Sequence, residues 1–121
     1  MKEKNNLEDR LVDFAVMVID YVETLPKNLV TTHLGKQLLR SGTAPALNYG
    51  EAQSAESRED FIHKMKICLK ELRESRISLR ILGRKKYLPI ARTKIVFDEC
   101  NELISIFVTS VQTAGKNKPN G

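Results

Sequence analysis

The chain has 121 residues, of which 41% are hydrophobic and 29% charged, and its formal net charge is +5. This length suits one domain with its own core, and the composition excludes a disordered chain. No apolar run approaches the ~18 residues of a membrane span. The polar N-terminus lacks the apolar core of a signal peptide, so we expect a cytoplasmic protein.

The first two of four expected helices form the N-terminal half. Apolar residues recur on one face from 7 to 25, and Pro26 then ends the helix. The second helix is expected from 32 to 55, with Thr31 or Thr32 as its N-cap. It contains three glycines and one proline, so its propensity is low and packing must stabilise it.

The third helix, expected from 57 to 86, carries the clearest core pattern. Ser57 begins a sequence that resembles a capping box. Pro89 favours the first turn of a fourth helix from 89 to 114, and 115–121 reads as a polar tail. Four long helices with short connections predict an all-α, up-down-up-down four-helix bundle in a single domain. The inner seam of the third helix comprises Phe61, Met65, Cys68, Leu72, Ser75, Leu79 and Leu82.

Few residues suit redox or metal chemistry. Cys68 and Cys100 fall on inner faces of their helices, which favours two reduced core thiols over an inter-helix disulfide in a reducing compartment. His33 and His63 have no cysteine or histidine at ligand spacing, so we expect no metal site. Because no phosphate-loop, dinucleotide or Ser-His-Asp signature is present, we also expect no cofactor.

Positive charge gathers on and beside the third helix. Residues 58–121 contain fourteen basic and seven acidic side chains, and such clustering indicates an anionic partner, RNA or DNA. The alternative is a solvated face that pairs with Glu71, Glu74 or a neighbouring subunit's acids. Tyr87 is the only aromatic residue expected nearby, which favours phosphate contacts over base stacking. The candidate nucleic-acid-binding residues are Lys66, Lys70, Arg73, Arg76, Arg80, Arg84, Lys85, Lys86, Arg92 and Lys94.

Several isoleucines fall outside the inner seams of the third and fourth helices. They are either scattered surface residues or a subunit interface, since contiguous exposed apolar patches usually mark contacts. We expect a homo-oligomer in which they meet a second copy. These residues are Ile67, Ile77, Ile81, Ile95 and Ile106.

Two polar patterns suggest further functions. Arg40, Asn48 and Glu51 lie on similar faces of the second helix, where they form either an internal network or the surface of an adaptor for another protein. Arg58 and His63 have the Arg-x-x-x-x-His spacing of HEPN ribonucleases, in which His would be the base and Arg would stabilise the phosphorane. This spacing is common by chance, so we expect no enzyme.

Short motifs along the chain resemble a known family. They are Leu38-Leu39-Arg40-Ser41, Asn48-Tyr49-Gly50-Glu51, Ser57-Arg58-Glu59-Asp60-Phe61, Leu69-Lys70-Glu71-Leu72 and Leu82-Gly83. Together they resemble the 23S rRNA intervening-sequence proteins, small bacterial four-helix bundles, from about residue 11 to 107. Ala52 departs from the family pattern, which has Gly there. The resemblance implies a ring of five subunits without catalytic activity. It also implies similarity to the accessory proteins of diversity-generating retroelements, which bind a reverse transcriptase and nucleic acid.

Overall fold

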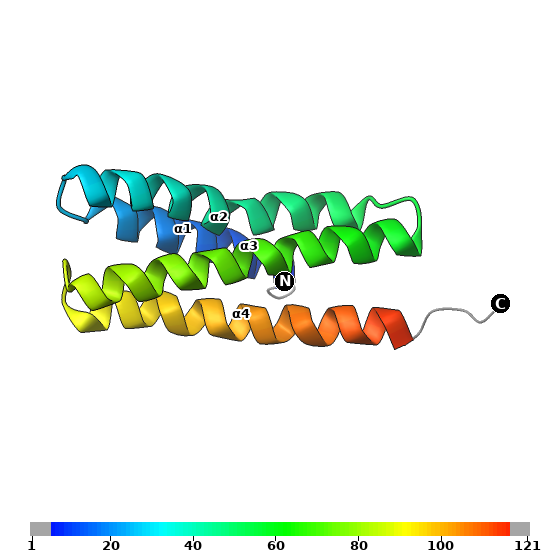
Figure 1. The fold of residues 1–121 in the computed structure, drawn as a ribbon. Coiled ribbons are helices and arrows are strands. Elements are labelled where there is room, and N and C mark those ends of the chain that lie inside the picture. The colour runs from blue at the N-terminus through cyan, green and yellow to red at the C-terminus, as the bar shows by residue number, and fades with distance from the viewer. Residues whose placement is uncertain (1–5, 117–121) are drawn as a thin grey trace, which may run out of the picture.

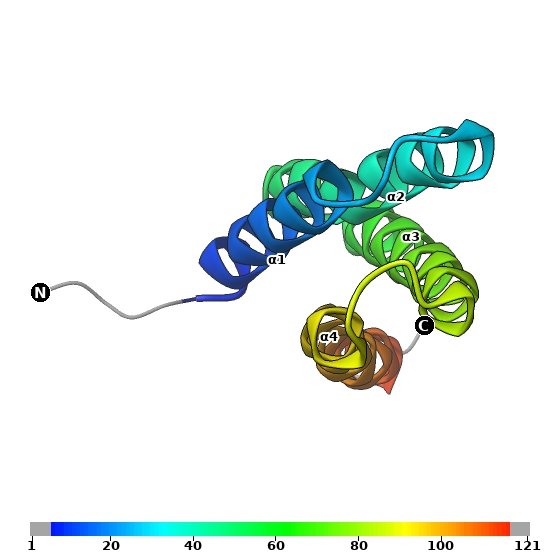
Figure 2. The same ribbon diagram turned by 90° about the vertical axis from the view of Figure 1, so that its left-hand side faces the viewer.

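Four helices make up the computed structural model, which describes residues 6–116 (Figure 1). Successive helices run in opposite directions, and no strand occurs between residues 6 and 116, so the predicted all-α, up-down-up-down bundle is confirmed. Each helix packs on its neighbour in the chain, whereas α1 and α4 approach each other less closely (Figure 2). The helices are α1 (Leu7–Glu23), α2 (Leu29–Gln53), α3 (Arg58–Lys85) and α4 (Ile90–Lys116).

Side-chain caps fix where the helices begin, and they correct one expected start. Asn6 caps α1, and Ser57 caps α3 as predicted. At α2 the Asn28 Oδ1 accepts from the Thr31 amide at 2.9 Å, and the Thr31 Oγ1 accepts from the Asn28 amide at 3.0 Å. This reciprocal capping box satisfies two free amides, so α2 begins at Leu29 rather than at residue 32.

The helix ends differ from the expected ones by one or two residues. Glu23 ends α1 two residues early, since Pro26 disfavours helical backbone at Leu25. Gln53 likewise ends α2 two residues early, and α3 lacks only the capping residue expected at each end. Helix α4 runs two residues farther, to Lys116, so the start of the predicted tail is helical, and 117–121 lie outside the described residues.

The inner faces of all four helices meet in one core. The predicted seam of α3 is confirmed, because its residues are buried apart from the half-buried Phe61. Phe14 of α1 and Phe107 of α4 are among the largest fully buried side chains. Cys68 and Cys100 are buried and unpaired, which agrees with the prediction of two core thiols.

Polar side chains join α1 to α4 where the two helices are less closely packed. The Arg10 Nε donates to Glu99 Oε2 at 2.7 Å. Farther along, the buried Tyr21 hydroxyl lies 2.8 Å from the Thr93 Oγ1. These contacts close the bundle on this side. None of the helices within residues 6–116 has the length and apolar character needed to cross a membrane.

Candidate nucleic-acid interface

An outward-facing row of cations runs along α3, opposite the buried seam. We call Lys66, Lys70, Arg73, Arg80 and Arg84 the basic ridge, and all of them are exposed. Their spacing of three, four and seven residues keeps them on one helical face. The row extends over about 27 Å, since an α-helix rises ~1.5 Å per residue. One face of the molecule therefore carries a line of positive charge.

Most of the basic ridge has no carboxylate partner. Within residues 6–116, Lys66, Arg73, Arg80 and Arg84 form no ion pair. Only Lys70 does, with its Nζ 3.7 Å from an oxygen of Glu74. The unpaired cations keep their full charge toward solvent, where a phosphate group could approach them.

The other candidate cations divide between the end of α3 and separate places. Lys85 and Lys86 are exposed just beyond the ridge. The half-buried Arg76 turns toward α4, where its Nη1 donates to Asn101 Oδ1 at 3.0 Å. Arg92 donates from Nη2 to the hydroxyl of Thr24, beyond the end of α1, at 3.1 Å. Arg76 and Arg92 thus lie away from the ridge, because contacts between helices direct their side chains elsewhere.

A groove lies beside the ridge, between the second half of α3 and the first half of α4. Its volume is about 430 Å³, and Arg80 and Arg84 of the ridge line it together with Lys94 and the half-buried Phe97. The sequence pattern places Phe97 on the inner face of its helix. Phe97 directly follows the buried Val96 and lies at the edge of the apolar face of its helix. A side chain at that edge can be partly exposed.

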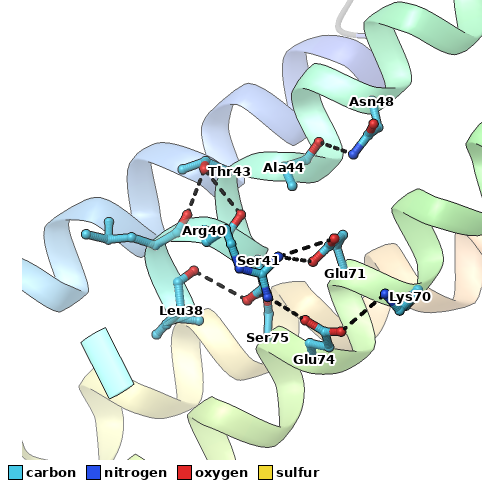
Figure 3. A network of polar contacts seen from close by, with 11 residues as sticks. Leu38, Arg40, Ser41, Thr43, Ala44, Asn48, Lys70, Glu71, Glu74 and Ser75 are labelled. Carbon is cyan, nitrogen blue, oxygen red and sulfur yellow. Dashed lines mark hydrogen bonds and ion pairs between the residues drawn. The ribbon is translucent and has the colours of Figure 1, made fainter. Parts of the chain in front are cut away.

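An ion-pair cluster on the neighbouring flank of α3 holds that helix against α2 (Figure 3). The Arg40 Nη1 lies 3.2 Å from Glu71 Oε1, and its Nη2 lies 2.9 Å from Glu74 Oε1. Hydrogen bonding to the Arg40 guanidinium holds the pKa of the Glu74 carboxyl below its ordinary value. The carboxylates expected as alternative partners of the ridge are thus directed mainly toward α2.

The three residues predicted as one polar constellation are not brought together. Arg40 binds the carboxylates of α3. The Asn48 Nδ2 donates to the Ala44 carbonyl of its own helix at 3.1 Å, and Glu51 accepts from the Lys64 ammonium at 2.9 Å. The reason is distance along the helix, since Arg40 and Asn48 are eight residues apart, about 12 Å at ~1.5 Å per residue. Each residue finds a nearer partner.

The candidate interface isoleucines form two sets instead of one patch. Ile77 and Ile81 are 48% and 44% exposed and line a groove shared with α2. Ile67 lies half-buried on the same flank of α3. Ile95 is 60% exposed and Ile106 half-buried, and both lie on the flank of α4 whose carboxylates bind α1. The rotation of each helix in the bundle separates the two sets.

The residues of the ribonuclease-like spacing also point to different places. Arg58 donates from Nη1 to the Ala114 carbonyl at 3.0 Å, across to the end of α4. His63 is exposed and lines a separate groove with Lys66, and Arg58 does not line it. Between residues 6 and 116, no group of three His, Cys, Asp or Glu side chains is arranged to hold a metal ion.

Comparison with known proteins identifies relatives of the whole bundle. The family model described as 23S rRNA-intervening sequence protein matches residues 3–109. Among solved structures, the chain is similar to a protein of unknown function from the S23 ribosomal protein family of Bacteroides thetaiotaomicron. The two are 30% identical with a TM-score of 0.78, and the match covers 88% of this chain and 98% of that one. No curated protein matches the chain.

Proposed function

The chain belongs to the 23S rRNA-intervening sequence protein family, and we propose that it is a homo-oligomeric, non-enzymatic protein that binds RNA or DNA through its basic ridge. The observation that carries this proposal is the exposed row on α3, in which Lys66, Arg73, Arg80 and Arg84 have no carboxylate partner within residues 6–116. The proposal includes a cytoplasmic location, supported by the two unpaired thiols.

The ridge suits the phosphate backbone rather than a particular base sequence. Lysine and arginine bind phosphate oxygens in any sequence, and each contact releases counterions from the nucleic acid. If the five ridge cations all contact a duplex, affinity should fall about 500-fold between 50 and 200 mM salt, from a slope of about −4.5. This salt dependence is the signature expected of the proposed interface.

Assembly of several copies would strengthen weak contacts at one ridge. We propose that Ile77 and Ile81, which expose apolar surface beside α2, meet a second copy. They share a groove with Arg80 and Arg84, so this contact would lie at the edge of the ridge. The family resemblance suggests a ring of five subunits, in which the ridge would repeat around the axis and raise affinity through avidity. Light scattering with and without added RNA tests this assembly. A monomer under both conditions would contradict it.

A matched pair of charge reversals tests the ridge. Lys66→Glu/Arg73→Glu should weaken binding of a labelled 20-base-pair duplex at least tenfold, measured by fluorescence anisotropy at 50 mM salt. Lys27→Glu/Lys36→Glu changes two exposed lysines outside the ridge and alters net charge by the same amount, so it should retain most of the affinity. Equal losses in both variants, or no binding by the unmodified protein, would remove the proposal.

A protein-binding adaptor is the second candidate, favoured by the exposed Ile77 and Ile81. It predicts that the isolated chain does not bind nucleic acid, which the anisotropy measurement tests. We assign no reaction to Arg58 and His63, because Arg58 binds the carbonyl at the end of α4. Cleavage of labelled RNA by the protein, lost in His63→Ala, would contradict this assignment.

A further inference from the structure

The groove between α3 and α4 has an apolar interior that opens to solvent. Its volume of about 430 Å³ lies within the ~300–1,000 Å³ common for ligand sites. Leu79 and Phe97 line it, and Ile90 at the start of α4 is 67% exposed. Phe97 lies two turns after Ile90 on α4, about 10.5 Å at ~1.5 Å per residue, so the groove offers a half-buried aromatic ring and a separate exposed aliphatic side chain for a ligand to cover.

Charged groups stand on both sides of this apolar surface. Arg80 and Arg84, one helical turn apart on α3, belong to the ridge and also line the groove. On α4 the Lys94 Nζ lies 2.7 Å from Asp98 Oδ2. That ion pair leaves Asp98 Oδ1 available as a hydrogen-bond acceptor. The groove therefore combines an apolar surface, two cations without carboxylate partners among residues 6–116, and one carboxylate acceptor.

We propose that this groove receives one unstacked base of a single-stranded nucleic acid. Its neighbouring phosphates would lie on Arg80 and Arg84, the base would stack on Phe97, and the adjoining nucleotide would cover Ile90. The inference rests on the proposed binding of nucleic acid by the ridge, and it adds that the preferred ligand is single-stranded. A duplex keeps its bases stacked inside, so it can offer the groove no base face.

The carboxylate favours a nucleotide over an acidic peptide as the occupant. Nucleobases carry N–H groups from which the Asp98 carboxylate can accept a hydrogen bond, whereas an ionised glutamate side chain has no donor to offer it. The ridge continues away from the groove along α3 for several turns. A nucleic acid strand supplies one negative charge at every nucleotide to such a row, which a peptide does only with an unbroken run of acidic residues.

Two strands with the same phosphates provide the first test. A 12-nucleotide RNA of mixed, non-pairing sequence and an abasic strand of equal length differ only in their bases. We expect the complete strand to bind the unmodified protein about tenfold more tightly at equal salt, because base–aromatic stacking adds to phosphate contacts. This arm needs no substitution and does not depend on the folding of a variant.

Side-chain changes in the groove provide the second test. Phe97→Leu keeps an apolar residue but removes the aromatic face, and Ile90→Ser changes a largely exposed residue. Each should weaken binding of the complete strand about fivefold or more and leave duplex and abasic affinities unchanged. Leu47→Ser alters an equally apolar residue that is 70% exposed on α2 and serves as the control with no expected effect. Helical circular dichroism confirms that each variant folds.

The outcomes separate this inference from the proposed function. Equal affinity for complete and abasic strands, with Phe97→Leu unchanged, overturns the groove proposal, while sensitivity to Lys66→Glu/Arg73→Glu still supports the ridge. Failure of every nucleic acid to bind at low salt overturns both. A third outcome uses an acidic peptide with a central phenylalanine. If this peptide displaces the RNA, and if Phe97→Leu weakens peptide binding more than RNA binding, the groove belongs to a protein partner.

Discussion

The hydroxyls of Ser41 and Ser75 lie 2.8 Å apart inside the contact between α2 and α3 (Figure 3). Both residues are buried, with exposures of 1% and 0%. Arg40 binds Glu71 and Glu74 beside this contact, so two polar links join the same stretches of the helix pair. Apolar side chains tolerate small shifts along a helix, whereas these links form in only one register. We infer that they fix the alignment of α2 with α3.

Removing one of the paired hydroxyls should destabilise the bundle. In Ser75→Ala the Ser41 hydroxyl loses its close partner and retains only a 3.5 Å contact with the Leu38 carbonyl. We expect the free energy of unfolding to fall by about 1–2 kcal/mol, the cost of leaving a buried polar group poorly satisfied. Urea denaturation followed by circular dichroism measures it.

The single variants Ser41→Ala and Ser75→Ala and the double variant Ser41→Ala/Ser75→Ala form a double-mutant cycle. Because the double variant leaves neither hydroxyl unpaired, its loss of stability should be smaller than the sum of the two single losses. Ser105→Ala, at an exposed position of α4, is the control with no expected change. Strictly additive losses would show that the two hydroxyls act independently.

Two glycines of α2 should respond in opposite directions to the same substitution. A Cβ at Gly42 would lie 2.8 Å from the Val18 Cγ2 of α1, whereas a Cβ at Gly50 would meet nothing within 4 Å. Gly50→Ala should therefore raise the free energy of unfolding by about 0.5–1 kcal/mol through helix propensity. Gly42→Ala should lower it by about 1–3 kcal/mol, as overpacking of a core usually does. Higher stability of both variants would contradict the close contact between α1 and α2.

Local sequence signals account for most of the fold. The seam of α3 follows from apolar periodicity, and Ser57 follows from capping chemistry. The start of α2 differs from the prediction because Asn28 caps it together with Thr31, where the common capping box has Glu or Gln. The apolar side chain of Leu25 predicts that α1 extends to this residue, but Pro26 disfavours helical backbone there.

The sequence predicts those parts of the candidate site that lie on a single helix, but not the contacts that depend on how the helices pack together. The basic ridge follows from the helical period alone, so its residues share one face as expected. The direction of Arg76 toward Asn101, and of Arg92 toward Thr24, depends on how the helices are rotated against each other. Periodicity indicates the inward face of each helix, but not which neighbouring helix each flank meets. The exposure of Phe97 in the groove depends on that rotation too.

The pairing of Arg40 with Glu74 should make stability depend on pH. The pKa of Glu74 is lower in the folded chain than the ordinary glutamate pKa of about 4.3. The ion pair therefore contributes to stability above that ordinary pKa, and this contribution is lost as pH falls through the lowered pKa. We expect Arg40→Ala to be less stable than the unmodified protein at pH 7 and pH 5, and the difference to shrink by pH 3. Urea denaturation at each pH tests this.

Lys36→Ala is the matched control for this series. It removes an exposed cation of α2 that has no ion pair within residues 6–116. Its stability relative to the unmodified protein should not change over the same range. A difference for Arg40→Ala that stays constant down to pH 3 would show that the guanidinium acts through packing and not through the carboxylate.

The two buried thiols should be inert in the folded protein. Burial raises the pKa of Cys68 and of Cys100 to about 12, and both are 0% exposed. Reaction requires the thiolate, so a thiol reagent at pH 8 should modify them at least a hundredfold more slowly without urea than in 8 M urea. Rapid modification of either thiol in the folded state would contradict its position in the core.

The same thiols should weaken the bundle in alkali. The pKa of each thiol is higher in the folded state than the ~8.5 of an exposed thiol. The stability that the protonated thiols contribute is therefore complete below about pH 8 and is lost as pH rises toward the folded pKa. Cys100→Ala removes one such group and about 1 kcal/mol of core packing at pH 7. Its deficit in the free energy of unfolding should therefore narrow between pH 8 and pH 11. A deficit that stays constant would show that Cys100 ionises as readily in the bundle as in the unfolded chain.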